Sequence, residues 1–291
     1  MGRIFDCFIF YNELDLLELR LEEYFEHVDY FVISEANFTH QNKEKQFNFE
    51  NNLERFKKFE SKIIYLKVIN KPEFKEGMTM DDYHWSLENY QRNKIIDLLS
   101  DINENDWVML SDLDEFYNPE ILQSLEKTID IYSMVMQPCL YYFNLMEVKR
   151  VKWKRFLFSH FSERYKFKYL SDVFWIKSKA ISGRVLRNHK LTDWRLMKDY
   201  KYYNHRYLHN AGFHFTYLGG FSKIMDKINS IVEGDINKEH LEIKKNPKIL
   251  ETCLKKNTNF MDEKSKLERI NLEILPVSIR NNRERLSLYL C

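Results

Sequence analysis

The sequence predicts an α/β protein built on an open, mostly parallel, Rossmann-like sheet. Strand-like segments alternate with amphipathic helical segments over residues 4–110, and such alternation is typical of a parallel sheet with right-handed connections. The first segment, residues 4–11, is apolar at nearly every position, as expected of a strand covered by helices on both faces. From about residue 224 onward the pattern is helical and rich in lysine, which predicts C-terminal helices.

The elements of the alternating region follow one another with short turns. Asn12 and Glu13 turn the chain from the first strand into a helix whose leucines recur at helical spacing. The further strands are expected at residues 29–34, 63–68 and 107–110, and the further helices at 53–59 and 84–99. If the first and fourth strands are neighbours, the residues that follow them share one crevice at the carboxyl ends of the strands.

The second half of the chain has a different character. After Pro138 it is rich in aromatic and basic residues, which predicts antiparallel strands and loops that complete the domain. Residues 213–217 lie between glycines and read as a short strand. Its alternation places Phe213 and Phe215 on the face opposite His214.

Composition and charge narrow the class of protein. Hydrophobic residues make up 44% and aromatic residues 15% of the 291 residues, which is enough for a sizeable core. No run of about eighteen apolar residues is present, which argues against a transmembrane helix, and the N-terminus does not read as a signal peptide. The four cysteines are far apart, which fits free thiols better than zinc ligands or disulfides. We therefore expect a cytoplasmic protein of a microbial cell or of a virus-infected host cell.

The net charge of +1 is unevenly divided along the chain. Residues 1–150 contain 16 Lys+Arg and 29 Asp+Glu, and the remaining residues contain 29 and 15. An acidic half suits cation binding, and a basic half suits a phosphate or an anionic acceptor. Two halves that simply attract each other would show the same division.

The end of the fourth predicted strand carries the most informative residues. Asp112, Asp114 and Glu115 follow an apolar run directly, and carboxylates at the end of a buried strand are costly unless a cationic group lies among them. A divalent metal that carries a phosphate-bearing ligand would supply it, because Mg²⁺ and Mn²⁺ prefer hard oxygen donors. An Asp-x-Asp pair also occurs in ordinary loops, and here Asn118 could simply cap a helix that begins at Pro119.

Four segments, taken in order, resemble glycosyltransferase family 17, the β-1,4-mannosyl-glycoprotein 4-β-N-acetylglucosaminyltransferase family. The first two segments are residues 5–21 and 32–39. The third consists of residues 91–93 followed by residues 111–115, and the fourth is residues 211–219. The resemblance covers roughly residues 4–237, and four motifs in the family's order make coincidence a poor explanation.

The resemblance implies a GT-A-like single domain at residues 1–237, with a nucleotide-sugar-binding half at 1–138 and an acceptor half at 139–237. Residues 238–291 would be a C-terminal helical extension. The implied reaction is the transfer of a sugar, GlcNAc by resemblance, from a UDP-sugar to a glycan acceptor, with inversion and with Mn²⁺ or Mg²⁺ as the metal. We expect a nucleotide-sugar donor and a glycan acceptor as partners and no nucleic acid.

The resemblance also assigns roles to residues at matching positions. Asp112 and Asp114 would hold the metal. His214 is a candidate third ligand because imidazole suits Mn²⁺, although a lone histidine is often structural. The residues expected to contact the nucleotide are Asn12, Glu13, Glu35, Arg92 and Asn93.

The general base that an inverting transfer needs is not singled out by the sequence. Its candidates are three carboxylates of the second half, Glu163, Asp172 and Asp193.

Two other functions stay open. A sugar-nucleotide nucleotidyltransferase also uses an α/β sheet, but such enzymes carry a Gly-rich basic loop where this chain has Asn12 and Glu13. A non-catalytic glycan or nucleic-acid binder could use the basic half, but no recognition motif accompanies that charge.

Overall fold

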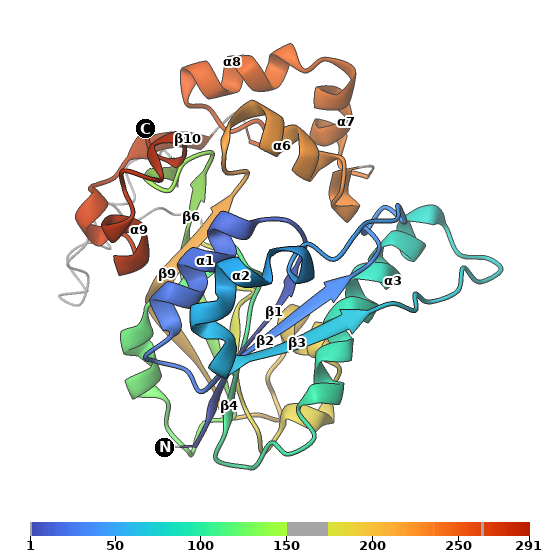
Figure 1. The fold of residues 1–291 in the computed structure, drawn as a ribbon, viewed down its shortest axis with the longest axis vertical. Helices are drawn as coiled ribbons and strands as arrows, with labels where there is room; N and C mark the ends of the chain where they lie inside the picture. The colour runs from blue at the N-terminus through green and yellow to red at the C-terminus, as the bar shows by residue number, and fades with distance from the viewer. Residues whose placement is uncertain (1, 150–173, 235, 263–264) are drawn as a thin grey trace.

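The computed structural model describes residues 2–149, 174–234, 236–262 and 265–291, and it confirms the α/β class (Figure 1). The strands in these residues are β1 (Ile4–Phe10), β2 (Tyr30–Ala36), β3 (Ile63–Val68), β4 (Trp107–Leu110), β5 (Glu115–Tyr117), β6 (Ile131–Leu140), β7 (Leu145–Lys149), β8 (Lys179–Ser182), β9 (His205–Thr216) and β10 (Ser265–Arg269). The helices are α1 (Leu14–Tyr24), α2 (Leu53–Phe56), α3 (Met80–Asn93), α5 (Leu191–Leu196), α6 (Gly220–Ile228), α7 (Lys238–Lys245), α8 (Lys248–Lys256) and α9 (Val277–Asn281).

The strands form one curled, mixed sheet in the order β10-β7-β6-β8-β4-β1-β2-β3, with β9 paired to β6 and β5 paired to β9. β3, β2, β1 and β4 are parallel, and β1 lies between β2 and β4. The predicted adjacency of the first and fourth strands is therefore confirmed. On the other side of β4 the pairings are antiparallel except for β6 with β9.

Both faces of β1, β2 and β4 are buried, as the apolar run of β1 predicts, whereas the edge strand β3 is mostly half-buried. Phe8 packs with Leu17 and Leu21 of α1 on one face. Phe5 and Cys7 pack on the opposite face in the cluster that contains the α5 side chain of Trp194. Figure 1 shows α1 and α2 in front of the strands and α3 to one side.

The helix predicted at 84–99 begins and ends elsewhere. It starts at Met80 because Thr79 and Asp82 form a capping box, in which each side chain binds the other's backbone N–H. It gives way to a 3₁₀ segment at Lys94–Leu98, so the apolar positions Ile95 and Leu99 reach the core from a tighter turn.

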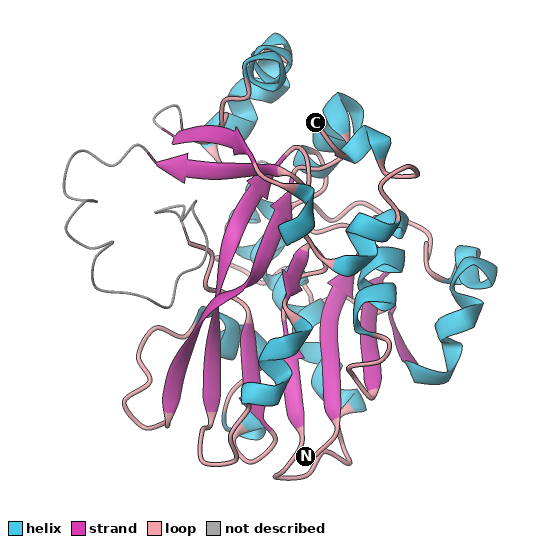
Figure 2. Ribbon diagram, turned by 90° about the vertical axis from the view of Figure 1, so that its left-hand side faces the viewer, coloured by secondary structure: helices cyan, strands magenta, loops and turns pink. Residues whose placement is uncertain are grey.

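The segment predicted as a purely helical extension also contains a strand. β10 pairs antiparallel with β7, and Leu267 lies opposite Glu147. Figure 2 shows this pair, next to the grey trace, lying across the end of the sheet. α6, α7 and α8 share a core of their own with the end of β6, through residues such as Tyr141, Ile224 and Leu250.

The cysteines of the protein form no disulfide. All four cysteines are free, and Cys7 and Cys139 are buried. Among the described residues, no helix combines the length and the apolar character needed to cross a bilayer.

Candidate active site

A cavity of about 1080 Å³ opens at the carboxyl ends of the parallel strands. Asn12 and Glu13, which follow β1, lie on its wall, and so do Asp112 and Asp114, which follow β4. This is the position expected of a ligand site in an open α/β sheet. Strand β9 contributes His214, so three separate parts of the chain meet in one cavity.

A buried arginine shapes the turn that carries the carboxylates. The guanidinium of Arg20, on α1, makes two hydrogen bonds to the carboxylate of Asp6 at 2.7 and 2.8 Å. It also donates to the backbone carbonyls of Asp112 at 3.1 Å, Leu113 at 3.3 Å and Glu115 at 2.8 Å. Because both ionic partners are 0% exposed, the turn is fixed from inside the core.

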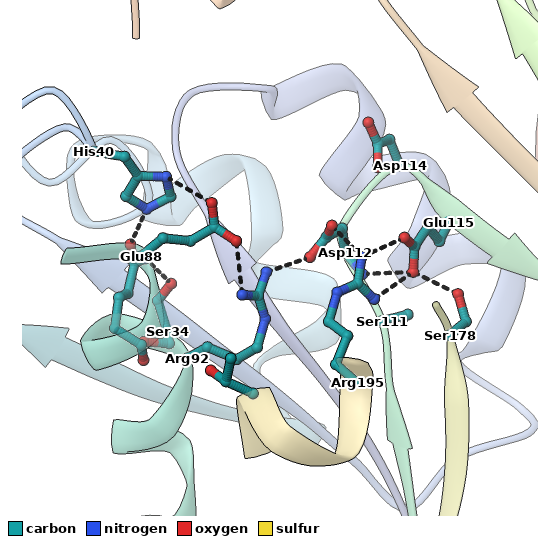
Figure 3. Close-up of polar contacts among 12 residues, drawn as sticks. Ser34, His40, Glu88, Arg92, Ser111, Asp112, Asp114, Glu115, Ser178 and Arg195 are labelled. Carbon is teal, nitrogen blue, oxygen red and sulfur yellow. Dashed lines mark hydrogen bonds and ion pairs between the residues drawn. The ribbon is translucent and has the colours of Figure 1, made fainter. Parts of the chain in front are cut away.

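Alternating charges run along one wall of the cavity (Figure 3). Arg92 donates to Glu88 and to Asp112, each at 2.7 Å. Arg195 pairs with the other oxygen of Asp112 and donates to Glu115 at 2.9 Å. Asp112 is the most open member of this charge network, with 30% of its side chain exposed against 0% for Glu115.

These arginines set the ionisation of the two acids. Burial by itself raises the pKa of Asp112, but the charges of Arg195 and Arg92 outweigh it, so the pKa lies below the usual aspartate value. The pKa of Glu115 is lowered in the same way, since Arg195 outweighs burial. Glu115 further accepts hydrogen bonds from the indole of Trp175 at 2.5 Å, from the hydroxyl of Ser178 and from the backbone N–H of Asp112 at 2.9 Å.

Asp114 points away from this network, toward β9 and α6 (Figure 3). Its carboxylate lies 2.8 Å from the Nζ of Lys227 and 3.7 Å from the Nε2 of His214. His214 is stacked on Trp175, with ring centroids 4.1 Å apart. Burial lowers the pKa of His214 more than Asp114 and Glu115 raise it, so the imidazole is neutral at pH 7 and able to bind a metal.

The pairing of β5 with β9 brings a possible donor set together. Glu115 lies opposite His214 in this pairing, and Asp114, Glu115 and His214 each offer one ligand atom within 4.8 Å of the others. Carboxylate oxygen and neutral imidazole nitrogen are donors that Mn²⁺ accepts. Of the three, Asp114 and His214 line the cavity, whereas Glu115 does not and is 0% exposed.

The residues expected to contact the nucleotide are divided between the cavity and the layer behind it. Asn12, Glu13 and Arg92 line the cavity. Asn93 lies behind the wall, where its side-chain oxygen accepts from the backbone N–H of Thr192 at 2.9 Å. Glu35, the last of these five residues, is fully buried, with 0% of its surface exposed.

Glu35 does not line the cavity but binds the loop beside it. Its carboxylate accepts from the Nζ of Lys45 at 2.6 Å, the hydroxyl of Tyr65 at 2.9 Å and the backbone N–H groups of Asn48 and Phe49. Lys45 in turn lines the cavity. Glu35 therefore acts on the site through Lys45.

Of the three base candidates, Asp193 is exposed on α5 and does not line the cavity. Glu163 and Asp172 lie outside the described residues.

Comparison with known families decides the class of this protein. The model of glycosyltransferase family 17 matches residues 1–230. The chain belongs to glycosyltransferase family 17. The matched region contains every acidic, basic and imidazole side chain of the clusters above, and membership in the family implies a sugar donor and an acceptor as substrates. No curated protein sequence matches the chain.

This family 17 member owes its charge balance to residues that the motifs did not reveal. Arg195 and Lys227 lie 83 and 113 residues away from the carboxylates that they contact. Arg195 follows the core residue Trp194 on a six-residue helix, so its position in the sequence suggests an ordinary helical arginine. Lys227 is one of many lysines in a basic segment. Only the fold brings them to the acidic turn, the segment after β4 that carries Asp112, Asp114 and Glu115.

Proposed function

We propose that this family 17 member is a metal-dependent, inverting glycosyltransferase with a GT-A fold, which transfers a sugar from a UDP-sugar to a glycan acceptor. The resemblance of its motifs to the family favours GlcNAc as the sugar. The observation that carries the proposal is the convergence of Asp112, Asp114 and His214 with Arg92, Arg195 and Lys227 in one cavity at the ends of the parallel strands.

The donor set fits a divalent metal. Asp114 and His214 would hold Mn²⁺ or Mg²⁺, with Asp112 on the same turn as the further carboxylate. When bound, the metal stabilises the charge that develops on the departing diphosphate. Arg92, Arg195 and Lys227 are cationic donors in the same cavity and suit phosphate oxygens, since charge-assisted hydrogen bonds to phosphate are strong.

The charge balance supports joint binding of metal and nucleotide. The seven charged side chains of the two clusters are Glu88, Asp112, Asp114, Glu115, Arg92, Arg195 and Lys227, which together carry one net negative charge. A nucleoside diphosphate alone would add two or three further negative charges to a partly buried site that is already negative. A bound divalent cation offsets two of them, so the cation favours binding of the nucleotide.

The proposal is tested by UDP release from UDP-GlcNAc. The wild-type protein should release UDP with Mn²⁺ and stop when the metal is chelated. Asp114→Asn and His214→Gln should lose most of this activity, whereas Asp199→Asn, an exposed aspartate outside the cavity, should retain it. Metal-independent UDP release that survives both substitutions would contradict the proposal. Pyrophosphate release from UTP and a sugar phosphate would indicate a nucleotidyltransferase instead.

A further inference from the structure

A second polar cluster lies in the cavity around Glu147 of β7. The Glu147 side chain is buried, and its Oε1 accepts a hydrogen bond from the Nδ2 of Asn259 at 2.9 Å. Nearby on the wall, the hydroxyl of Tyr217 and the Nε2 of His240 lie 2.7 Å apart. All four side chains line the cavity.

Glu147 is buried and differs from the other acids of the cavity, which are partly exposed. Those that pair with an arginine or a lysine are Asp15, Glu88, Asp112 and Asp114. In the described part of the chain, Glu147 has no such ion pair, and its partner is the neutral amide of Asn259. A buried carboxylate with one neutral donor costs stability, and the residue opposite it on β10 is the apolar Leu267. The packing of the sheet therefore gives no reason for a carboxylate here.

Glu147 lies two strands away from His214 in the sheet. β6 pairs with β7 through Cys139 and Met146, and with β9 through Pro138 and His214. β7 and β9 are thus two strand spacings apart, on the order of 10 Å. The carboxylate of Glu147 and the groups expected to hold the diphosphate line different parts of one cavity.

Part of the cavity wall comes from residues that lie beyond the family match. The family match ends at residue 230, and Asn237, His240, Asn259 and Met261 all follow it and line the cavity. The groups expected to bind the donor lie within the match. The part of the cavity that lies outside the family match is therefore suited to the acceptor.

We propose that Glu147 is the general base of the transfer and that Asn259 is its positioning residue, an inference that rests on the function proposed above. The acceptor is a sugar hydroxyl. Its oxygen bonds to the anomeric carbon of the donor as the bond from that carbon to the diphosphate oxygen breaks, and the bonding electrons leave with UDP. The hydroxyl proton passes to the carboxylate of Glu147 and from there to solvent.

The test compares two nucleophiles, water and azide, with UDP-GlcNAc and Mn²⁺. Water must lose a proton during transfer, whereas azide carries none. Glu147→Gln should slow hydrolysis by about 10²- to 10⁴-fold, the range for loss of a general base, and should keep azide-dependent UDP release at the wild-type rate. Glu268→Gln, an exposed carboxylate on β10, is the matched control and should leave both reactions unchanged.

Thermal unfolding separates a catalytic role from a structural one. Glu147→Gln should unfold at the wild-type temperature or above it, because a buried charge with a neutral partner has been removed. Hydrolysis at the wild-type rate would overturn the assignment of Glu147. So would loss of both reactions together with a lower unfolding temperature. A wild-type protein that releases no UDP with either nucleophile would disprove the proposed function, and the inference with it.

Asn259→Asp tests the positioning residue. Besides Asn259, the described neighbours of Glu147 include Leu267, which is apolar, and Tyr141, which stays neutral because burial raises its pKa. His240 lies on the same wall. A second carboxylate beside Glu147 disfavours its ionised form, so the acid limb of the pH profile for hydrolysis should move to higher pH. An acid limb at the wild-type position would contradict the role of Asn259.

Discussion

Arg195 is one of two buried arginines that balance the charge of the site, because it contacts both Asp112 and Glu115 while only 4% of its side chain is exposed. Arg195→Leu leaves the fully buried Glu115 and the partly exposed Asp112 without this counter-charge. Removing one partner of a buried ion pair costs about 3–5 kcal/mol. We expect the free energy of unfolding, measured by urea denaturation, to fall by that amount.

Arg206→Leu is the matched control for this substitution. Arg206 also pairs with a glutamate, Glu126, but each side chain is 53% exposed. Exposed ion pairs contribute about 0–1 kcal/mol, so this variant should be close to wild type. Equal destabilisation by the two substitutions would show that the Arg195 pairs carry no special weight.

At the scale of elements, the pairing of β5 with β9 aligns Glu115 with His214. Because Gly212 has no side chain, the two strands can approach each other closely there. Gly212 has φ +140, and a Cβ built there would lie 2.0 Å from the backbone oxygen of Phe116. Because backbone atoms cannot move aside cheaply, Gly212→Ala should separate the two strands. We expect a marked loss of thermal stability and of metal binding.

Gly77→Ala controls for backbone conformation alone. Gly77 also has a positive φ, +83, but a Cβ there meets nothing within 4 Å. The left-handed conformation costs an alanine roughly 1–2 kcal/mol. If Gly212→Ala destabilises the protein no more than Gly77→Ala does, the close approach of β5 and β9 is not needed for the fold.

The elements also show what the sequence can predict and what it cannot. The bounds of β1 and β4 agree with the predicted bounds to within one residue, because their apolar runs are local signals. The early start of α3 depends on a capping box at Thr79 that lies before the apolar stripe. β10 was missed because its five residues acquire a strand conformation by pairing with β7, more than 100 residues earlier in the chain.

The residues of the site divide in the same way, into those that a local motif reveals and those that only long-range contacts reveal. Asp112, Asp114 and His214 belong to short motifs and could be found from sequence, and the fold brings them to one cavity. Arg195, Lys227 and the neighbours of Glu147 have no local signal, because their importance comes only from contacts across the fold. Long-range ion pairs and cavity walls therefore have to be read from the structure.

At the scale of the whole molecule, the lowered pKa values of Asp112 and Glu115 link stability to pH. Their ordinary pKa values are 3.8 and 4.5, and both are lower in the folded protein. The unfolded chain therefore binds protons first as the pH falls. The stability that these acids contribute is fully present above about pH 4.5 and is lost progressively as the pH falls toward their folded pKa values.

Arg195→Leu isolates this contribution from that of the other acids. Without Arg195 the pKa values of Asp112 and Glu115 should no longer be held as low, so the variant has less of this stability to lose. The difference in urea midpoint between wild type and variant should be largest near pH 7 and should shrink between pH 4.5 and pH 3. A difference that stays constant over this range would disprove the linkage.

The measurement that tests the central claim most directly is calorimetric binding of UDP with and without Mn²⁺. The charge balance of the cavity predicts that Mn²⁺ tightens UDP binding, that UDP tightens Mn²⁺ binding by the same factor, and that Asp114→Asn removes this coupling. An affinity for UDP that is identical in Mn²⁺ and in a chelator, for the wild type and for Asp114→Asn alike, would contradict a metal–nucleotide site at the acidic turn.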